Sequence, residues 1–428
     1  MTDATRFVEE RARRTPVTVE TEVLVVGGGS AGVAAAVAAA RNGADVTLVE
    51  RYSYLGGLAT GGLIILLLTM DDGRGQQVIG GLAQEAVDRI QRRGGEWHPP
   101  AADWGSADEA LVERSRMWGL INGHGPHNVR YSVAYDPEEM KFAFEQMLKD
   151  AGVRLIYNAW ACDPLVDGDR LTGATFQSKS GRFAIIADVV IDTCGDGDVF
   201  AAAGCEHETE TVAPWLWFTM GGVQDVPAAA ATGRCFQTIG EGHVLLPWGA
   251  TERISRMVDA TKPEDITFAL LECRELVMDE IDRLRRDVPQ FRDAYITHIA
   301  DQLGVTESRR LVGEHVLTRE EMDRPHDDDV AVTGHWTKYG ALYHIPYGSL
   351  LAKEYQNLLT AGRSISVDHR VHHATKEIPA CMATGEAAGT AAALSLSLDA
   401  EPKRVDIAAL RSRLVERGAI LAVRDGAA

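Results

Sequence analysis

The stretch TEVLVVGGGSAGVAAAVAAARNGADVTLVE, residues 21–50, decides the fold class of this 428-residue chain. Residues 23–26 form a continuous apolar run, which is typical of a parallel strand that is buried on both faces. Small residues at 31–40 predict a helix that can pack closely on this strand, and residues 46–49 predict a second strand. Alternation of strand, helix and strand predicts an α/β fold built on a parallel sheet.

A GxGxxG motif, formed by Gly27, Gly29 and Gly32, joins the first predicted strand to the helix. In such a turn the first glycine permits a tight bend, the second lets the backbone approach a diphosphate, and the third lets the helix pack on the strand. The amides and the positive dipole at the helix N-terminus favour the diphosphate. Glu50 ends the second strand, where its carboxylate can accept hydrogen bonds from a ribose. The motif therefore predicts a dinucleotide site, and it leaves both NAD and FAD open.

Composition and charge exclude several classes of protein. Hydrophobic residues make up 45% and charged residues 25% of the chain, as in a globular protein. The length of 428 residues predicts two to three domains, or one large domain that carries an inserted one. The longest bulky apolar run, residues 63–68, is far shorter than the roughly 20 residues that span a membrane. Residues 1–14 lack an apolar core, so no signal peptide is expected and a cytoplasmic location is predicted. The formal net charge of −19 disfavours binding to nucleic acids.

Beyond the first unit, the pattern alternates between helices and short β-rich segments. Asp136, Pro137 and Glu139 occupy the cap, first-turn and capping-box positions of a helix that is expected to run to about residue 150. Residues 152–192 contain three β-rich segments separated by turns, which predicts a meander that returns to a buried strand. One long amphipathic helix is expected at 263–287.

Several further stretches resemble one superfamily of flavoenzymes. RYSYLGGLATGG, residues 51–62, resembles the extended signature of FAD-dependent oxidoreductases of the glutathione-reductase-like superfamily. VVIDTCGDGDVFAAAG, residues 189–204, resembles the strand that passes the flavin adenosine there, although Cys194 departs from the usual Ala-Thr-Gly. The stretches ESRRLVGEHVLT, IPYGSLL, NLLTAGRSIS and IPACMATGEAAGTAAAL, at 307–394, resemble the family of FAD-dependent oxidoreductases that has a single nucleotide-binding fold.

This resemblance implies that FAD is the cofactor and assigns a set of residues to it. The set comprises Gly27, Gly29, Ser30, Ala31, Gly32, Glu50, Arg51, Gly57, Leu58, Ala59, Thr60, Ala161, Cys194, Gly195, Asp198, Gly362, Arg363, Gly385, Ala387 and Ala388. Gly362 lets backbone pass close to the ribityl chain or the diphosphate, and Arg363 can oppose a phosphate charge. A helix that opens near Thr384 would point its amides at the flavin. The alternative, a closely packed core helix, remains open.

The same resemblance implies the domain organisation. The expected fold is a Rossmann-like FAD-binding domain with a β-meander, made of residues 20–62, 136–206 and 341–428. A mixed α+β substrate domain, made of residues 63–135 and 207–340, is inserted into it. Residues 1–19 are expected to form a polar leader.

Three residues are predicted to take part in catalysis. The resemblance places His369 near the isoalloxazine, where it would transfer a proton, and the alternative is that it packs the cofactor. Arg309 would hold a substrate carboxylate or stabilise reduced flavin, or else form a salt bridge to a nearby glutamate. His344 precedes a segment that by resemblance enters the active-site cavity. Lys376 stands where relatives often have arginine, and Cys381 is interpreted as a buried thiol rather than a nucleophile.

No metal site is predicted, because the cysteines show no CxxC pair and the HxxHH cluster at 369–373 lacks a supporting carboxylate pattern. The absence of a second GxGxxG and of a cysteine pair also disfavours a reductase with its own NAD(P)H module or redox disulfide.

The predicted function is therefore dehydrogenation or oxidation of a small-molecule substrate by hydride transfer to flavin N5. The alternatives are a flavin-dependent monooxygenase that uses external NAD(P)H and a non-redox FAD- or NAD-binding protein of the same superfamily. The sequence leaves open whether identical chains assemble into an oligomer.

Overall fold

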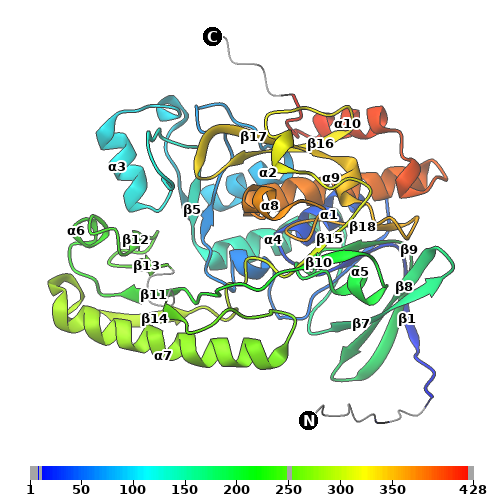
Figure 1. The fold of residues 1–428 in the computed structure, drawn as a ribbon, viewed down its shortest axis with the longest axis horizontal. Coiled ribbons are helices and arrows are strands. Elements are labelled where there is room, and N and C mark those ends of the chain that lie inside the picture. The colour runs from blue at the N-terminus through cyan, green and yellow to red at the C-terminus, as the bar shows by residue number, and fades with distance from the viewer. Residues whose placement is uncertain (1–7, 9–11, 248–252, 423–428) are drawn as a thin grey trace.

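A seven-stranded sheet forms the centre of the computed structural model, which describes residue 8, residues 12–247 and residues 253–422 (Figure 1). Strand β1 (Val17–Val26) lies between β2 (Val46–Val49) and β9 (Gly181–Asp192), and β6 (Arg154–Ile156) lies beyond β2. All of these neighbours are parallel. The predicted α/β class and the Rossmann-like sheet are confirmed.

Strand β9 connects the parallel sheet to the predicted meander. Its first half pairs with β8 (Arg170–Ser178), which pairs with β7 (Trp160–Asp167), and both pairings are antiparallel. Its last three residues pair in parallel with β18 (Leu358–Thr360). The carboxyl ends of β1, β2, β9 and β18 consequently lie at one edge of the sheet.

Two helices made largely of small residues cover one face of this sheet. Helix α1 (Ser30–Arg41) is buried from Ala31 to Ala39 and packs along α9 (Ile378–Ser397). A Cβ at Gly385 would lie 2.1 Å from the carbonyl oxygen of Ala31, and one at Gly389 would lie 2.0 Å from that of Ala35. These glycines therefore allow the two helices to approach closely. Because Pro379 occupies its first turn, α9 begins at Ile378, and the prediction of a helix opening near Thr384 was wrong.

The remaining elements surround this core. Helix α4 (Pro137–Ala151) packs against α1, and α2 (Gly81–Gln91) packs against α4 and α9. The predicted long helix is α7 (Pro263–Asp287), and it lies beside an antiparallel sheet in Figure 1. That sheet has the order β12 (Phe236–Gln237), β13 (Val244–Leu246), β11 (Phe218–Gly221) and β14 (Tyr295–Ile299).

Short elements complete the chain. The small sheets comprise β3 (Leu66–Leu67), β5 (Val133–Tyr135) and β4 (Glu96–Trp97), the pair β10 (His207–Thr209) and β15 (Arg309–Leu311), and the hairpin β16 (Asp329–His335) and β17 (Lys338–Pro346). The short helices are α3 (Glu109–Met117), α5 (Asp198–Ala202), α6 (Val226–Ala230), α8 (His369–Thr375) and α10 (Ile407–Glu416). Among the described residues, no helix is long and apolar enough to cross a membrane.

The proposed division into two domains stays a prediction. One boundary differs in detail, because β1 begins at Val17 and the last three residues of the expected leader belong to this strand.

Candidate functional site

A cavity of about 540 Å³ opens at the carboxyl edge of the central sheet. Gly27, Glu50, Thr193 and Ala361 line it, and each directly follows the last residue of β1, β2, β9 or β18. Open α/β sheets bind ligands at this edge. The volume lies within the roughly 300–1,000 Å³ of small-molecule and cofactor sites.

The glycine-rich turn forms one wall of the cavity, and each glycine of the motif has a different environment. Gly27 has φ of +104°, and a Cβ there would lie 2.6 Å from the carbonyl oxygen of Thr193. A Cβ at Gly32 would lie 1.9 Å from the carbonyl oxygen of Gly27. A Cβ at Gly29 would meet no atom within 4 Å. The space in front of Gly29, next to a helix N-terminus that no side chain caps, fits a diphosphate.

Glu50 is buried and held by two backbone amides. The N–H of Gly28 donates to its Oε2 at 2.6 Å, and the N–H of Tyr52 donates to its Oε1 at 2.7 Å. Burial raises the pKa of this carboxyl, and the two amide hydrogen bonds act against that rise. The same carboxyl therefore orders the glycine-rich turn and lines the cavity.

Aromatic side chains flank Arg51 beside this carboxylate. Its guanidinium carbon lies 5.0 Å from the ring centroid of Tyr52 and 5.1 Å from that of Trp160. Trp160 lines the cavity although its residue is 54% exposed, whereas the predicted Ala161 does not line it. Adjacent residues of a strand point to opposite faces, which explains why the neighbour of the predicted residue is the one that lines the cavity.

Arg363 connects the turn that follows β18 to the turn that follows β9. Its three guanidinium nitrogens donate to the carbonyl oxygen of Gly195 at 2.6 Å, to that of Val305 at 2.7 Å and to Asp196 Oδ1 at 2.5 Å. Burial acts to raise the pKa of Asp196, but the charges of Arg363 and Arg51 and the hydrogen bonds from Ser308 and Arg363 together lower it below its usual value. Arg363 thus lines the cavity, and each of its guanidinium nitrogens already donates to an oxygen of the protein.

A further part of the lining comes from a segment distant in sequence. Its residues lie at the start of α7 and after β14, and they are Ala260, Thr261, Pro263, Ile266, Gln302, Leu303, Val305 and Arg309. The lining also includes Gly56, Gly57, Leu58, Ala59 and Ile64, which follow β2 in the chain. Residues of the predicted inserted segment thus close the cavity over the turn that follows β2.

Lys376, Ile378 and Cys381, from the end of α8 and the beginning of α9, also line the cavity. Lys376 Nζ lies 3.8 Å from Glu377 Oε1, and burial raises the pKa of Glu377 to about 7. The thiol of Cys381 donates to the carbonyl oxygen of Lys376 at 3.2 Å. Burial raises the pKa of Cys381 to about 12, so this thiol stays protonated at neutral pH, as the buried-thiol interpretation requires.

The structure separates the three predicted catalytic residues. Arg309 lines the cavity, and its Nη1 lies 3.3 Å from Asp198 Oδ1. His369 begins α8 with a 56% exposed side chain and pairs with Glu307 Oε2 at 2.9 Å. His344 is buried in β17, where its Nδ1 lies 3.2 Å from Asp329 Oδ2. Neither histidine lines the cavity.

Most of the predicted cofactor residues meet at this cavity. Those that line it are Gly27, Gly29, Ser30, Ala31, Glu50, Arg51, Gly57, Leu58, Ala59, Cys194, Gly195, Asp198, Gly362 and Arg363. Those that do not are Gly32, Thr60, Ala161, Gly385, Ala387 and Ala388. Thr60 instead donates its hydroxyl to the carbonyl oxygen of Leu55 at 2.5 Å. Their individual roles toward a cofactor stay predictions.

Replacing Glu50 with alanine is expected to weaken cofactor retention by about 1–3 kcal/mol, the scale of a lost hydrogen bond to a charged group. A titration of the apoprotein with FAD, followed by fluorescence, measures this change. Glu145→Ala is the matched control, because Glu145 accepts the hydroxyl of Tyr157 at 2.8 Å and does not line the cavity. Equal affinity of the wild type for FAD and FMN would contradict the role of Glu50, since FMN has no adenosine ribose.

Comparisons with known proteins agree with this geometry. A family model described as FAD dependent oxidoreductase matches residues 22–414. The crystal structure of a geranylgeranyl bacteriochlorophyll reductase-like protein from Thermoplasma acidophilum is similar with a TM-score of 0.50 and 13% identity, over 94% of this chain and 84% of that chain. The structure of p-nitrophenol 4-monooxygenase from Pseudomonas putida is similar with a TM-score of 0.50 and 14% identity, over 94% and 87% of the two chains. At these identities the likeness shows the fold.

Proposed function

Because this chain belongs to the FAD-dependent oxidoreductase family, we propose that it dehydrogenates or oxidises a small organic molecule in the cavity at the carboxyl edge of its sheet. FAD is its cofactor, and when bound the flavin supplies a hydride acceptor at N5. The observation that carries the proposal is the composition of the cavity. The cavity combines the open space in front of Gly29 with apolar lining side chains and one lysine, Lys376.

We assign the two ends of the cavity to different parts of the cofactor. Glu50 and Arg51 would hold the adenosine, and the amides that follow Gly29 would hold the diphosphate. The isoalloxazine is then left to the end formed by residues 57–59, 302–305 and 376–381. Leu58, Ile64, Leu303, Val305 and Ile378 make this end apolar, so they would exclude water from the reacting atoms.

Lys376 is the cation best placed to contact the substrate or the reduced flavin. Arg363 and Arg309 also line the cavity, but their guanidinium groups donate to nearby carbonyl or carboxylate oxygens of the protein. Among the residues that the structure describes, the nearest carboxylate oxygen to Lys376 Nζ is Glu377 Oε1, 3.8 Å away. We therefore propose that Lys376 orients a carbonyl or carboxylate group of the substrate. His369 and His344 remain predictions, and their positions outside the cavity favour supporting roles.

The proposed reaction predicts how the bound flavin responds to reductants in the absence of oxygen. NADH and NADPH are expected to bleach the visible flavin absorbance no faster than they bleach free FAD. A small carboxylate- or carbonyl-bearing molecule from a substrate panel is expected to bleach it at turnover speed. Anaerobic stopped-flow absorbance measures both rates.

Rapid bleaching by NAD(P)H, followed by oxygen incorporation into a product, would instead identify a monooxygenase. A protein that holds FAD and is reduced neither by the panel nor by NAD(P)H would support the non-redox alternative.

A further inference from the structure

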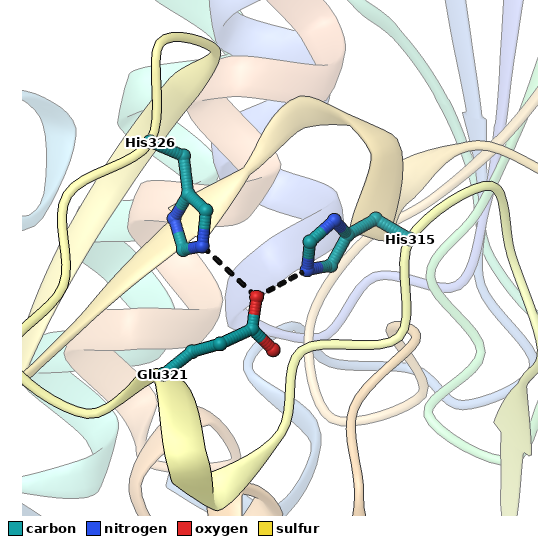
Figure 2. A group of neighbouring side chains, drawn as sticks. All are labelled: His315, Glu321 and His326. Carbon is teal, nitrogen blue, oxygen red and sulfur yellow. Dashed lines mark hydrogen bonds and ion pairs between the residues drawn. The ribbon is translucent and has the colours of Figure 1, made fainter.

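The connection between β15 and β16 brings two histidines and a glutamate together outside the cofactor cavity (Figure 2). His315 Nε2 lies 2.9 Å from Glu321 Oε1, and His326 Nε2 lies 3.0 Å from the same oxygen. One nitrogen of each histidine and one oxygen of the glutamate all lie within 4.8 Å of one another. Three potential metal ligands thus converge on one point.

The carboxylate of Glu321 is held in place by its other oxygen. Glu321 ends the short helix η5 (Arg319–Glu321), and its Oε2 accepts the N–H and the hydroxyl of Thr318, each at 2.8 Å. This capping box fixes the carboxylate against its own backbone. The contacts of Oε2 with Thr318 therefore fix the carboxylate in an orientation in which Oε1 points toward the two imidazoles.

A buried carboxylate orients His326 from behind. His326 Nδ1 lies 3.1 Å from Asp329 Oδ1, and Asp329 is 2% exposed at the start of β16. A hydrogen bond from Nδ1–H to Asp329 leaves Nε2, the nitrogen that faces Glu321, as the one that would bind a metal when the ion displaces its proton. In metal sites, a histidine ligand usually donates its other ring N–H to a carboxylate, which fixes the orientation of the ring. Asp329 holds His326 in this way. The backbone of His315 is also held, because its N–H donates to the carbonyl oxygen of Gly348 at 3.1 Å.

We propose that His315, Glu321 and His326 bind a divalent transition-metal ion of the Zn²⁺ type. Tetrahedral bonds of about 2.0–2.1 Å place neighbouring ligand atoms about 3.3 Å apart, so the two histidine–carboxylate separations of 2.9 and 3.0 Å need to widen only slightly. Two imidazole nitrogens favour zinc-like ions over Mg²⁺ and Ca²⁺, which prefer oxygen ligands. Three protein ligands leave a fourth position for water, and the partly exposed His315 leaves the site accessible to solvent.

A second cluster in the chain shows that three neighbouring ligand atoms are not enough to predict a metal site. Glu210, Glu307 and His369 also bring three such atoms together. However, Arg310 forms ion pairs with both glutamates, and its fixed positive charge would repel a metal cation. No comparable arginine or lysine pairs with Glu321, whose ion-pair partners among the described residues are His315 and His326.

Zinc binding by the FAD-loaded protein tests the proposal. The protein is first stripped of metals with a chelator and dialysed, and then titrated with Zn²⁺ alone at neutral pH. Equilibrium dialysis with elemental analysis is expected to find one tightly bound Zn²⁺ per wild-type chain. Glu321→Gln and His326→Gln are each expected to weaken this binding by at least about 10- to 100-fold, the range seen when even an outer-shell partner of a metal ligand is lost.

Two comparisons separate ligation from folding. Glu321→Gln keeps a side chain that can cap η5, so normal thermal unfolding and a normal FAD content are expected together with the loss of zinc. His298→Gln is the matched control, because His298 pairs with Asp301 at 3.5 Å and belongs to neither cluster. It is expected to bind Zn²⁺ like the wild type.

The proposal is overturned if the wild type binds no Zn²⁺ after this treatment, which would leave a hydrogen-bonded histidine cluster. It is also overturned if Glu321→Gln binds Zn²⁺ as tightly as His298→Gln. Neither result depends on the oxidoreductase activity, because the readout is metal content.

Discussion

Replacing Gly29 with valine is expected to produce a folded protein that is colourless because it no longer holds FAD. The backbone at Gly29 is extended, with φ of −65° and ψ of 179°, so valine fits it without strain. The new side chain would point into the cavity, where a Cβ meets no protein atom within 4 Å. Forcing a side chain into filled space costs about 1–3 kcal/mol or more. At about 1.4 kcal/mol per factor of ten, a cost at the upper end of this range or beyond it lowers FAD affinity by about 100-fold or more, which is the expected result.

Gly32→Ala is compared with Gly29→Val because it is expected to affect the stability of the turn and not only the binding of FAD. A Cβ at Gly32 would lie 1.9 Å from the carbonyl oxygen of Gly27, so alanine is expected to distort the turn itself and to lower the thermal stability of the apoprotein. Gly29→Val should leave that stability near the wild-type value. Flavin absorbance of the purified proteins and thermal unfolding of the apoproteins measure the two effects separately. Full flavin loading of Gly29→Val would refute the assignment of the motif.

The helices and strands that could be predicted from the sequence are those whose bounds are set by residues within the element itself. The strand at 46–49 and the helix at 263–287 have the observed bounds. The strand is marked by residues of high β-propensity, Val-Thr-Leu-Val, and the helix by proline in its first turn. The turn at Gly27 also follows from its own residues, since its φ is positive. The expectation that α9 opens near Thr384 was wrong, because Pro379 in the first turn places the start of the helix at Ile378.

The residues of the site that were missed depend on contacts between distant segments. Trp160 lines the cavity because the meander places that face of β7 beside Arg51, and no local pattern indicates which of two neighbouring residues does so. Gln302 and Ile266 line it because the segment around α7 folds over the carboxyl edge of the sheet. A single sequence contains no signal for such packing. The resemblance located His369 in the chain but did not reveal that its side chain faces Glu307 instead of the cavity.

Lys376→Met is expected to slow reduction of the flavin by substrate by roughly 10²- to 10³-fold, the usual cost of losing one group placed to stabilise developing charge. Methionine keeps the apolar stem and removes the cation. Because reduced flavin carries negative charge, the variant is also expected to have a lower flavin reduction potential. A drop of about 30 mV would correspond to about 1.4 kcal/mol for a two-electron couple. Stopped-flow reduction and equilibrium redox titration measure the two quantities, and the second needs no known substrate.

Lys353→Met is the matched control for this prediction, because Lys353 is exposed and pairs with Glu206 at 3.3 Å, outside the cavity. Its rate and potential should equal those of the wild type. His369→Ala is expected to change the rate only a few-fold, since its side chain points toward Glu307 and solvent. A large rate loss in His369→Ala with an unchanged potential in Lys376→Met would reverse the assignment. It would mean that the end of the cavity near α9 does not contact the isoalloxazine and that His369 handles the proton.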